Sequence, residues 1–172
     1  MKLNLGAAER HLDGFLTVDI DPVYKPDFVA DLTKAWPWPD NSVDEVYAKD
    51  VFEHLPDKRH TMNELWRVLK VGGRATIQVP HATLGDGGHC DPTHCSYWTA
   101  SDFEYYTPYD GFGKPVVERY KFRKSSYYGI NADFKILNLD AKGHIPLKKY
   151  ARTYGGVVVA IFAVVEKIIF TG

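Results

Sequence analysis

Small residues followed by a carboxylate form the first set of side chains in this sequence that could do chemistry. Gly6-Ala7-Ala8 follows a short apolar stretch beginning at Leu3, and Asp19 lies at the end of a second apolar run beginning at Phe15. A turn of small residues lets a ligand approach the backbone, and a carboxylate at the end of the next strand can accept two hydrogen bonds from a ribose diol. The spacing indicates a site for a nucleotide-type cofactor, although such a turn also occurs where a strand simply ends.

Histidines form the second set. His81, His89 and His94 follow the apolar run that ends at Pro80, and His54 follows the apolar run before it. Because imidazole titrates near neutral pH, a histidine suits the removal of a proton from a substrate. We expect one of them to be a catalytic base, in the order of preference His94, His89, His81, His54. Each of them could instead be a hydrogen-bonded loop residue.

The segment HCDPTHC, residues 89–95, also contains side chains that can bind metals. Zinc sites often take two ligands that lie a few residues apart. No second pair of ligands is evident elsewhere in the sequence, and Asp91-Pro92-Thr93 is typical of a turn. We therefore expect this segment to be a loop that contacts the substrate, and we expect no bound metal.

The composition is that of a globular chain. Its 172 residues are 45% hydrophobic and 25% charged, which suits one domain, residues 1–172, with a sizeable core. The 21 basic and 22 acidic side chains nearly cancel, so an extended nucleic-acid surface is disfavoured. A small molecule is the partner we expect.

Cysteine usage and apolar runs bear on location. Two cysteines, Cys90 and Cys95, and an N-terminus without a signal-peptide pattern favour a cytoplasmic enzyme. The longest apolar run, residues 155–170, is interrupted by Glu166 and Lys167 and is shorter than the roughly 20 residues that span a bilayer. We expect buried strand and helix there and no transmembrane segment, with contact at a membrane surface as the alternative.

Short strands must position the first set of residues. Alternating or continuous apolar residues predict strands at 3–5, 15–20, 28–30 and 43–48. The first three are joined by only a few residues, whereas a parallel crossover normally takes about a dozen or more. The first two helices of an α/β fold must therefore be reduced to turns.

One helix is clear in the sequence. Apolar residues at three- and four-residue spacing predict it over 59–69, with a stop at 71–73. These apolar residues are Met62, Leu65, Trp66 and Leu69. A strand at 74–79 follows, and a strand, helix, strand unit implies parallel pairing with a right-handed crossover. The fold class is therefore α/β.

The second half of the chain is less regular. Ser101 is expected to cap a short helix over 102–106. Apolar runs predict strands at 116–122 and 134–139, and a last strand at about 167–171. Because no long helix separates these late strands, we expect antiparallel pairing at the edge of the sheet.

Four ordered motifs in residues 2–80 support a family resemblance. The succession of LNLG with VDIDP, then ADL, then WPDNSVDEVYAKDVFEHLPD, then NELWRVLKVGGRATIQVP resembles the class I S-adenosylmethionine-dependent methyltransferases. It is most similar to a small subgroup with LNLG and EHL motifs. The resemblance implies S-adenosylmethionine as cofactor and a Rossmann-like, seven-stranded, mostly parallel sheet. The last strand would be antiparallel and the N-terminal helices reduced.

The same resemblance implies which residues contact the cofactor. They are Gly6, Ala7 and Ala8 for the methionine part, Asp19 for the ribose, Ile20, Asp31 and Leu32 for the adenine, and Ala48, Lys49 and Asp50 near the sulfonium and acceptor.

The sequence departs from the family pattern at two positions. Asn4 stands where the family has an acidic residue, and Ala8 stands where it has a second glycine. If Ala8 needs a positive φ, alanine costs about 1 kcal/mol there. The family's helical segment before the first motif is also missing, so we expect closure of the site by residues 80–98 or by another subunit of a homo-oligomer.

The resemblance implies methyl transfer to a small molecule, and the hydroxyl or amine of a sugar or nucleotide-sugar is our first expectation. Two other functions stay open. The chain could be an S-adenosylmethionine-binding module without activity, or an NAD-dependent dehydrogenase, which uses a similar strand, turn and carboxylate. The lack of a full GxGxxG disfavours the dehydrogenase.

Overall fold

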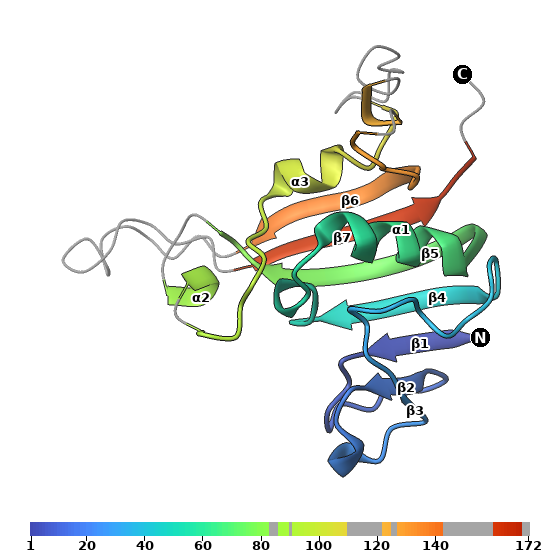
Figure 1. Ribbon diagram of the computed structural model, residues 1–172, viewed down its shortest axis with the longest axis vertical. Coiled ribbons are helices and arrows are strands. Elements are labelled where there is room, and N and C mark those ends of the chain that lie inside the picture. The colour runs from blue at the N-terminus through green and yellow to red at the C-terminus, as the bar shows by residue number, and fades with distance from the viewer. Residues whose placement is uncertain (83–85, 90, 110–121, 125–126, 143–159, 170–172) are drawn as a thin grey trace.

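A computed structural model of the chain describes residues 1–82, 86–89, 91–109, 122–124, 127–142 and 160–169. Their strands form one seven-stranded sheet in the order β3-β2-β1-β4-β5-β7-β6 (Figure 1). The strands are β1 (Lys2–Leu5), β2 (Leu16–Asp19), β3 (Phe28–Val29), β4 (Val43–Lys49), β5 (Leu69–Pro80), β6 (Phe134–Lys142) and β7 (Ala160–Lys167). Strands β1 to β5 pair in parallel with one another, whereas β7 runs antiparallel between β5 and β6. The predicted fold class and the antiparallel last strand are confirmed.

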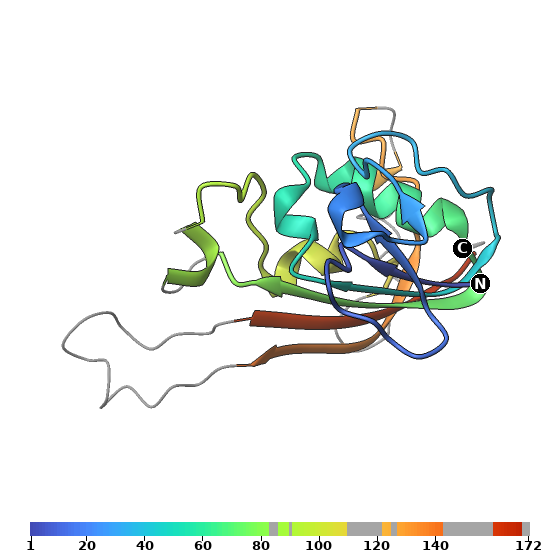
Figure 2. The ribbon, with the colours of Figure 1, turned by 90° about the horizontal axis from the view of Figure 1, so that it is seen from below.

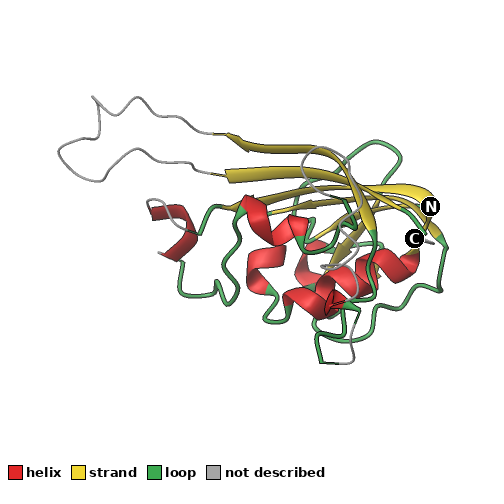
Figure 3. Cartoon of the chain, turned by 90° about the horizontal axis from the view of Figure 1, so that it is seen from above, coloured by secondary structure: helices red, strands yellow, loops and turns green. Residues whose placement is uncertain are grey.

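The described helices are few and lie on one face of the sheet, as the views from below and above show (Figures 2 and 3). They are the α-helices α1 (Lys58–Val68), α2 (Asp86–His89) and α3 (Ala100–Glu104), and the single 3₁₀ turns η1 (Pro22–Tyr24) and η2 (Phe52–His54). Between β1 and β2 the chain makes only turns, and between β2 and β3 it makes only η1. The predicted reduction of the first two helices is therefore confirmed. None of the described helices is long and apolar enough to cross a membrane.

Local chemistry defines the start of α1. The Asp57 carboxylate caps it by accepting from the backbone N–H groups of Arg59 and His60. Met62, Leu65 and Val68 are buried against the sheet, which satisfies the predicted apolar spacing.

The predicted helix stop at 71–73 was wrong, because α1 ends at Val68 and those residues belong to β5. Gly72 has a φ of +79°, and a Cβ on Gly73 would lie 2.8 Å from the carbonyl oxygen of Lys70. Both glycines therefore permit an irregularity within the strand, where the β4–β5 register shifts between Val43 and Glu45.

Two predictions for later elements need correction. The cap of α3 is Thr99, not Ser101, because Thr99 and Asp102 form a reciprocal capping box. The last described strand is β7, which begins at Ala160, well before the predicted 167–171. Its alternate side chains are buried, but a continuous apolar run hides that period in the sequence. The strand predicted at 116–122 lies outside the described residues, apart from Phe122.

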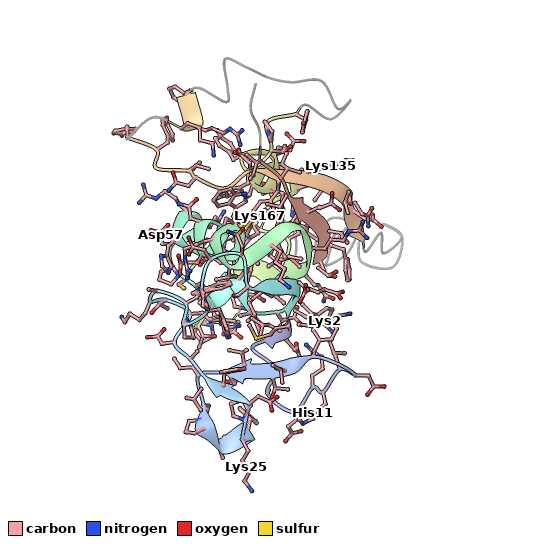
Figure 4. All side chains as sticks on the ribbon, turned by 90° about the vertical axis from the view of Figure 1, so that its right-hand side faces the viewer. Lys2, His11, Lys25, Asp57, Lys135 and Lys167 are labelled. Atoms are coloured by element: carbon pink, nitrogen blue, oxygen red, sulfur yellow. The ribbon has the colours of Figure 1, made fainter. Side chains whose placement is uncertain are left out.

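The core lies between the sheet and its helices. A buried lysine lies at the edge of this core. Lys167, labelled in Figure 4, is 3% exposed at the end of β7. Its Nζ donates to Asn41 Oδ1 at 2.7 Å and lies 4.2 Å from the centre of the Trp66 ring. Burial lowers the pKa of Lys167. This side chain therefore ties β7 to α1 and to the segment before β4.

Candidate active site

The carboxyl ends of β1, β2 and β4 surround a cavity of about 300 Å³. In an open parallel sheet this edge is the usual place for a ligand, above all where the strand order reverses, as it does here between β1 and β4. The residues that line the cavity are Gly6, Asp19, Ile20, Ala30, Asp31, Leu32, Thr33, Asp50, Val51, His54 and Leu55.

The turn after β1 forms one wall of this cavity. Gly6 has a φ of +56°, and a Cβ at this position would collide with the side chain of Val51. Only glycine lets the β1 turn and the β4 exit approach so closely. Ala8 also has a positive φ, +44°, so the strain anticipated from its residue type is present.

Asp19 is held in place by this turn. Its Oδ2 accepts from the backbone N–H of Ala8 at 2.8 Å, and its Oδ1 accepts from the N–H of Asp21 at 3.0 Å. Each carboxylate oxygen has a further lone pair. The group therefore lines the cavity with a fixed orientation and with capacity to accept two more hydrogen bonds.

Asp31 lines the same cavity from the end of β3. Its Oδ1 accepts from the N–H of Thr33 at 2.9 Å and from its hydroxyl at 2.6 Å. The Thr33 hydrogen bonds lower the pKa of Asp31 below its usual range, so the group is an anion at neutral pH. Asp19 and Asp31 thus face one hollow.

Not all of the predicted cofactor residues reach the cavity. Ala7 and Ala48 are each 1% exposed in the core, and neither they nor Ala8 and Lys49 line the cavity. Asp50 does line it, in the left-handed region with a φ of +57°. Sequence reasoning did not name Ala30, Thr33, Val51 and Leu55, although each lies close after the end of a strand.

Of the histidines, His54 lines the cavity, whereas the three preferred candidates His81, His89 and His94 do not. His89 is exposed and stacks on the ring of Tyr97 at 4.3 Å between centroids. His81 is part of an isolated bridge with Trp98. His94 packs edge-on against His54, with 4.8 Å between their centroids. His94 therefore approaches the cavity only through His54.

A buried carboxylate lies beside these two rings. The side chain of Glu53 is 3% exposed, and its Oε1 lies 4.0 Å from Nε2 of His94. Its Oε2 is buried and has no hydrogen-bond partner in the described part of the chain. Burial raises the pKa of Glu53 to about 7, so this carboxyl exchanges protons near neutral pH.

The loop that carries His94 is bound to η2 by backbone hydrogen bonds. The N–H groups of Cys95 and Ser96 both donate to the carbonyl of Glu53 at 2.9 Å, and Ser96 Oγ donates to Phe52 O at 2.9 Å. The predicted turn is confirmed, since the N–H of Thr93 donates to Asp91 Oδ1 at 2.8 Å. Cys90 lies outside the described residues.

Solved structures of other methyltransferases share this fold at low sequence identity. A putative methyltransferase from Bacillus halodurans aligns at 14% identity with a TM-score of 0.62, covering 98% of this chain and 92% of that one. A putative S-adenosylmethionine-dependent methyltransferase from Listeria monocytogenes aligns at 11% identity with a TM-score of 0.58, covering 98% of this chain and 91% of that one. A putative methyltransferase from Haloferax volcanii, solved with the Trm112 activator, aligns at 15% identity with a TM-score of 0.59. The alignment covers 98% of this chain and 82% of that one.

The sequence itself matches a family as well. Residues 12–77, from the β1–β2 turn to the middle of β5, match the model of the methyltransferase domain family. Residues 12–77 thus resemble a methyltransferase domain, and nearly the whole chain shares the fold of these solved structures. No curated protein matches the sequence.

The residues at the cavity fit the cofactor. S-adenosylmethionine supplies a methyl group on a sulfonium, which an acceptor can attack in line. The chain presents the Asp19 carboxylate with spare lone pairs, the exposed apolar side chain of Ile20 and the Asp31 anion, which are kinds of groups that can bind a diol, an aromatic ring and an amino group. Gly6 leaves room that a Cβ would fill.

Proposed function

We propose that this chain is an S-adenosylmethionine-dependent methyltransferase that acts on a hydroxyl or amine of a small molecule, with a sugar or nucleotide-sugar as the first acceptor class. One observation carries the proposal: the cavity that contains Asp19 and Asp31 is also lined by His54, which contacts His94. Groups that can hold an adenosyl part and groups that can receive a proton therefore meet in one hollow. A sugar acceptor is supported by the resemblance to the LNLG and EHL subgroup.

The proposed cofactor contacts fall into two groups. Gly6, Asp19, Ile20, Asp31, Leu32 and Asp50 touch the cofactor directly, since all of them line the cavity. The remaining predicted residues act through others. Ala8 orients Asp19 by its N–H group, and Lys49 lies 3.9 Å from the Asp50 carboxylate. Ala7 and Ala48 pack beneath the turn and the strand end.

Methyl transfer needs an aligned acceptor and a way to remove its proton. Asp19 and Asp31 fix the adenosyl part from β2 and β3, on the opposite side of the β1 turn from η2. The acceptor then enters beside His54, and its proton leaves at the cluster of Glu53, His54 and His94. We name this cluster the EHH cluster.

We also propose that the enzyme works in a reducing compartment such as the cytoplasm. The described cysteine, Cys95, is a free and exposed thiol.

The proposal is tested by binding and turnover in parallel. Calorimetry with S-adenosylmethionine and with NAD measures which cofactor binds, and release of S-adenosylhomocysteine over a panel of sugars, nucleotide-sugars and amines measures transfer. We expect micromolar S-adenosylmethionine binding, no NAD binding, and turnover with at least one hydroxyl acceptor. Binding without turnover across the panel would favour the inactive module.

A further inference from the structure

The EHH cluster brings together three side chains of the kinds that bind transition metals. One ligand atom from each of Glu53, His54 and His94 lies within 4.8 Å of the other two. Glu53 and His54 come from η2, and His94 comes from the loop bound to η2 through Cys95 and Ser96. Its members are thus held together by backbone hydrogen bonds rather than by flexible side chains.

Hydrogen bonds at Nδ1 decide which ring nitrogen of each histidine is free. His94 Nδ1 lies 3.1 Å from the carbonyl oxygen of Gly88, which can only accept. His54 Nδ1 lies 3.3 Å from the carbonyl and 3.1 Å from the hydroxyl oxygen of Thr93. That hydroxyl gives its hydrogen to Asp91 Oδ1 at 2.5 Å, so it too accepts. Both neutral rings therefore carry hydrogen on Nδ1 and a lone pair on Nε2.

This arrangement is typical of metal-binding histidines. Such a histidine almost always donates its other ring N–H to a carbonyl, carboxylate or water, which fixes the tautomer and the direction of the lone pair. In the EHH cluster Thr93 and Gly88 take this role. The Asp91 carboxylate accepts from the Thr93 hydroxyl and so fixes the orientation of the hydroxyl that His54 contacts.

Glu53 offers such a site a buried carboxyl oxygen. Glu53 is 2% exposed, and its Oε2 has no hydrogen-bond partner among the residues that the structure describes. The contacts of His94 Nε2 with Glu53 Oε1 at 4.0 Å and with Asp91 Oδ2 at 3.8 Å are too long for hydrogen bonds. A buried carboxylate oxygen without a partner is costly, and a cation between the three side chains would satisfy it.

We propose that Glu53, His54 and His94 bind a divalent transition metal ion such as Zn²⁺, with one coordination position open to the cofactor cavity. Two imidazoles and a carboxylate form a common catalytic zinc set that leaves a position for water or substrate. Ligands of a tetrahedral zinc lie about 3.4 Å apart, so the three side chains must move together by up to about 1.4 Å on binding.

This inference deepens the proposed function and rests on it for the role of the metal. An acceptor hydroxyl in the open position would have its pKa lowered, as metal-bound water does. The hydroxyl would lose its proton to water, and its ionised oxygen would attack the methyl carbon while the bond from that carbon to the sulfonium sulfur breaks, which releases S-adenosylhomocysteine. Hydroxyl acceptors, above all those with a second oxygen to chelate the ion, are therefore favoured over amines.

Metal titration of the tag-free, chelator-treated full chain tests the site. Calorimetry with Zn²⁺ and the visible absorption of Co²⁺ are recorded without cofactor or acceptor. We expect one equivalent, a Kd of micromolar or tighter, and Co²⁺ bands of a four-coordinate site. Glu53→Gln, His54→Ala and His94→Ala should each weaken binding at least 10-fold. His11→Ala, an exposed histidine far from the cluster in the chain, should leave it unchanged.

Folding is checked in the same samples. Each variant should melt near the wild type in chelator, and Zn²⁺ should raise the Tm of the wild type but not of Glu53→Gln. Absence of one-equivalent binding, or binding that the three variants do not weaken, overturns the metal site. If S-adenosylmethionine still binds in that case, the proposed function stands. Metal binding without any S-adenosylmethionine binding would instead overturn the proposed function.

Discussion

Replacing Ala8 with glycine should stabilise this enzyme, although it removes a methyl group from a turn beside the active site. Ala8 has a φ of +44°, a conformation that costs an L-residue roughly 1–2 kcal/mol. Glycine adopts this conformation without strain. It also has more entropy than alanine in the unfolded chain, which lowers the free energy of unfolding by about 0.4–1 kcal/mol. The expected net gain is about 0.5–1 kcal/mol. For a chain of this length, such a gain raises Tm by roughly 1–4 °C.

Urea and thermal unfolding of Ala8→Gly measure the gain directly. Ala7→Gly is the matched control, because Ala7 is 1% exposed and has no positive φ. That change loses a buried methyl group and adds chain entropy, so it should destabilise by about 1 kcal/mol or more. The N–H of residue 8 remains to orient Asp19 in either variant. Loss of stability in Ala8→Gly would refute the strain assigned to this turn.

Three further predictions concern other contacts of the fold. Gly6→Ala should destabilise by about 2 kcal/mol or more in urea unfolding, because its methyl group collides with Val51, and Val51→Ala should restore part of the loss. Asn63→Ala should cost about 2–3 kcal/mol by the same measurement, since its side chain bonds the backbone at Gly129, Asn131 and Ala132. Hydrogen bonding from Lys70 lowers the pKa of Asp44 to about 2, so its contribution to stability is present above about pH 4 and lost as pH falls toward 2. In acid unfolding, the free energy of unfolding of Asp44→Asn should therefore fall less steeply between about pH 4 and pH 2 than that of the wild type.

Local patterns in the sequence were sufficient to predict part of the lining of the cavity. The turn at Gly6 and the position of Asp19 depend on residues that are close in the chain. The cost of alanine at position 8 also follows from residue type once a positive φ is required.

Contacts between distant segments could not be predicted in the same way. Glu53 and His94 meet because the N–H groups of Cys95 and Ser96 donate to the Glu53 carbonyl, and no periodicity in the sequence indicates that pairing. The pattern HCDPTHC drew attention to ligands within one loop, whereas the structure combines its second histidine with η2. The continuous apolar run up to Val165 likewise concealed where β7 begins.

Calorimetric titration of S-adenosylhomocysteine into wild type and Asp19→Asn tests the central claim most directly, namely that the cavity between Asp19 and Asp31 holds the adenosyl group. The substitution removes the charge that would accept from the ribose, and we expect affinity to fall by roughly 10-fold to 100-fold, about 1.4–2.8 kcal/mol. Asp13→Asn, at an exposed position in the connection between β1 and β2, should bind like the wild type. Equal affinity of Asp19→Asn and wild type would contradict the account.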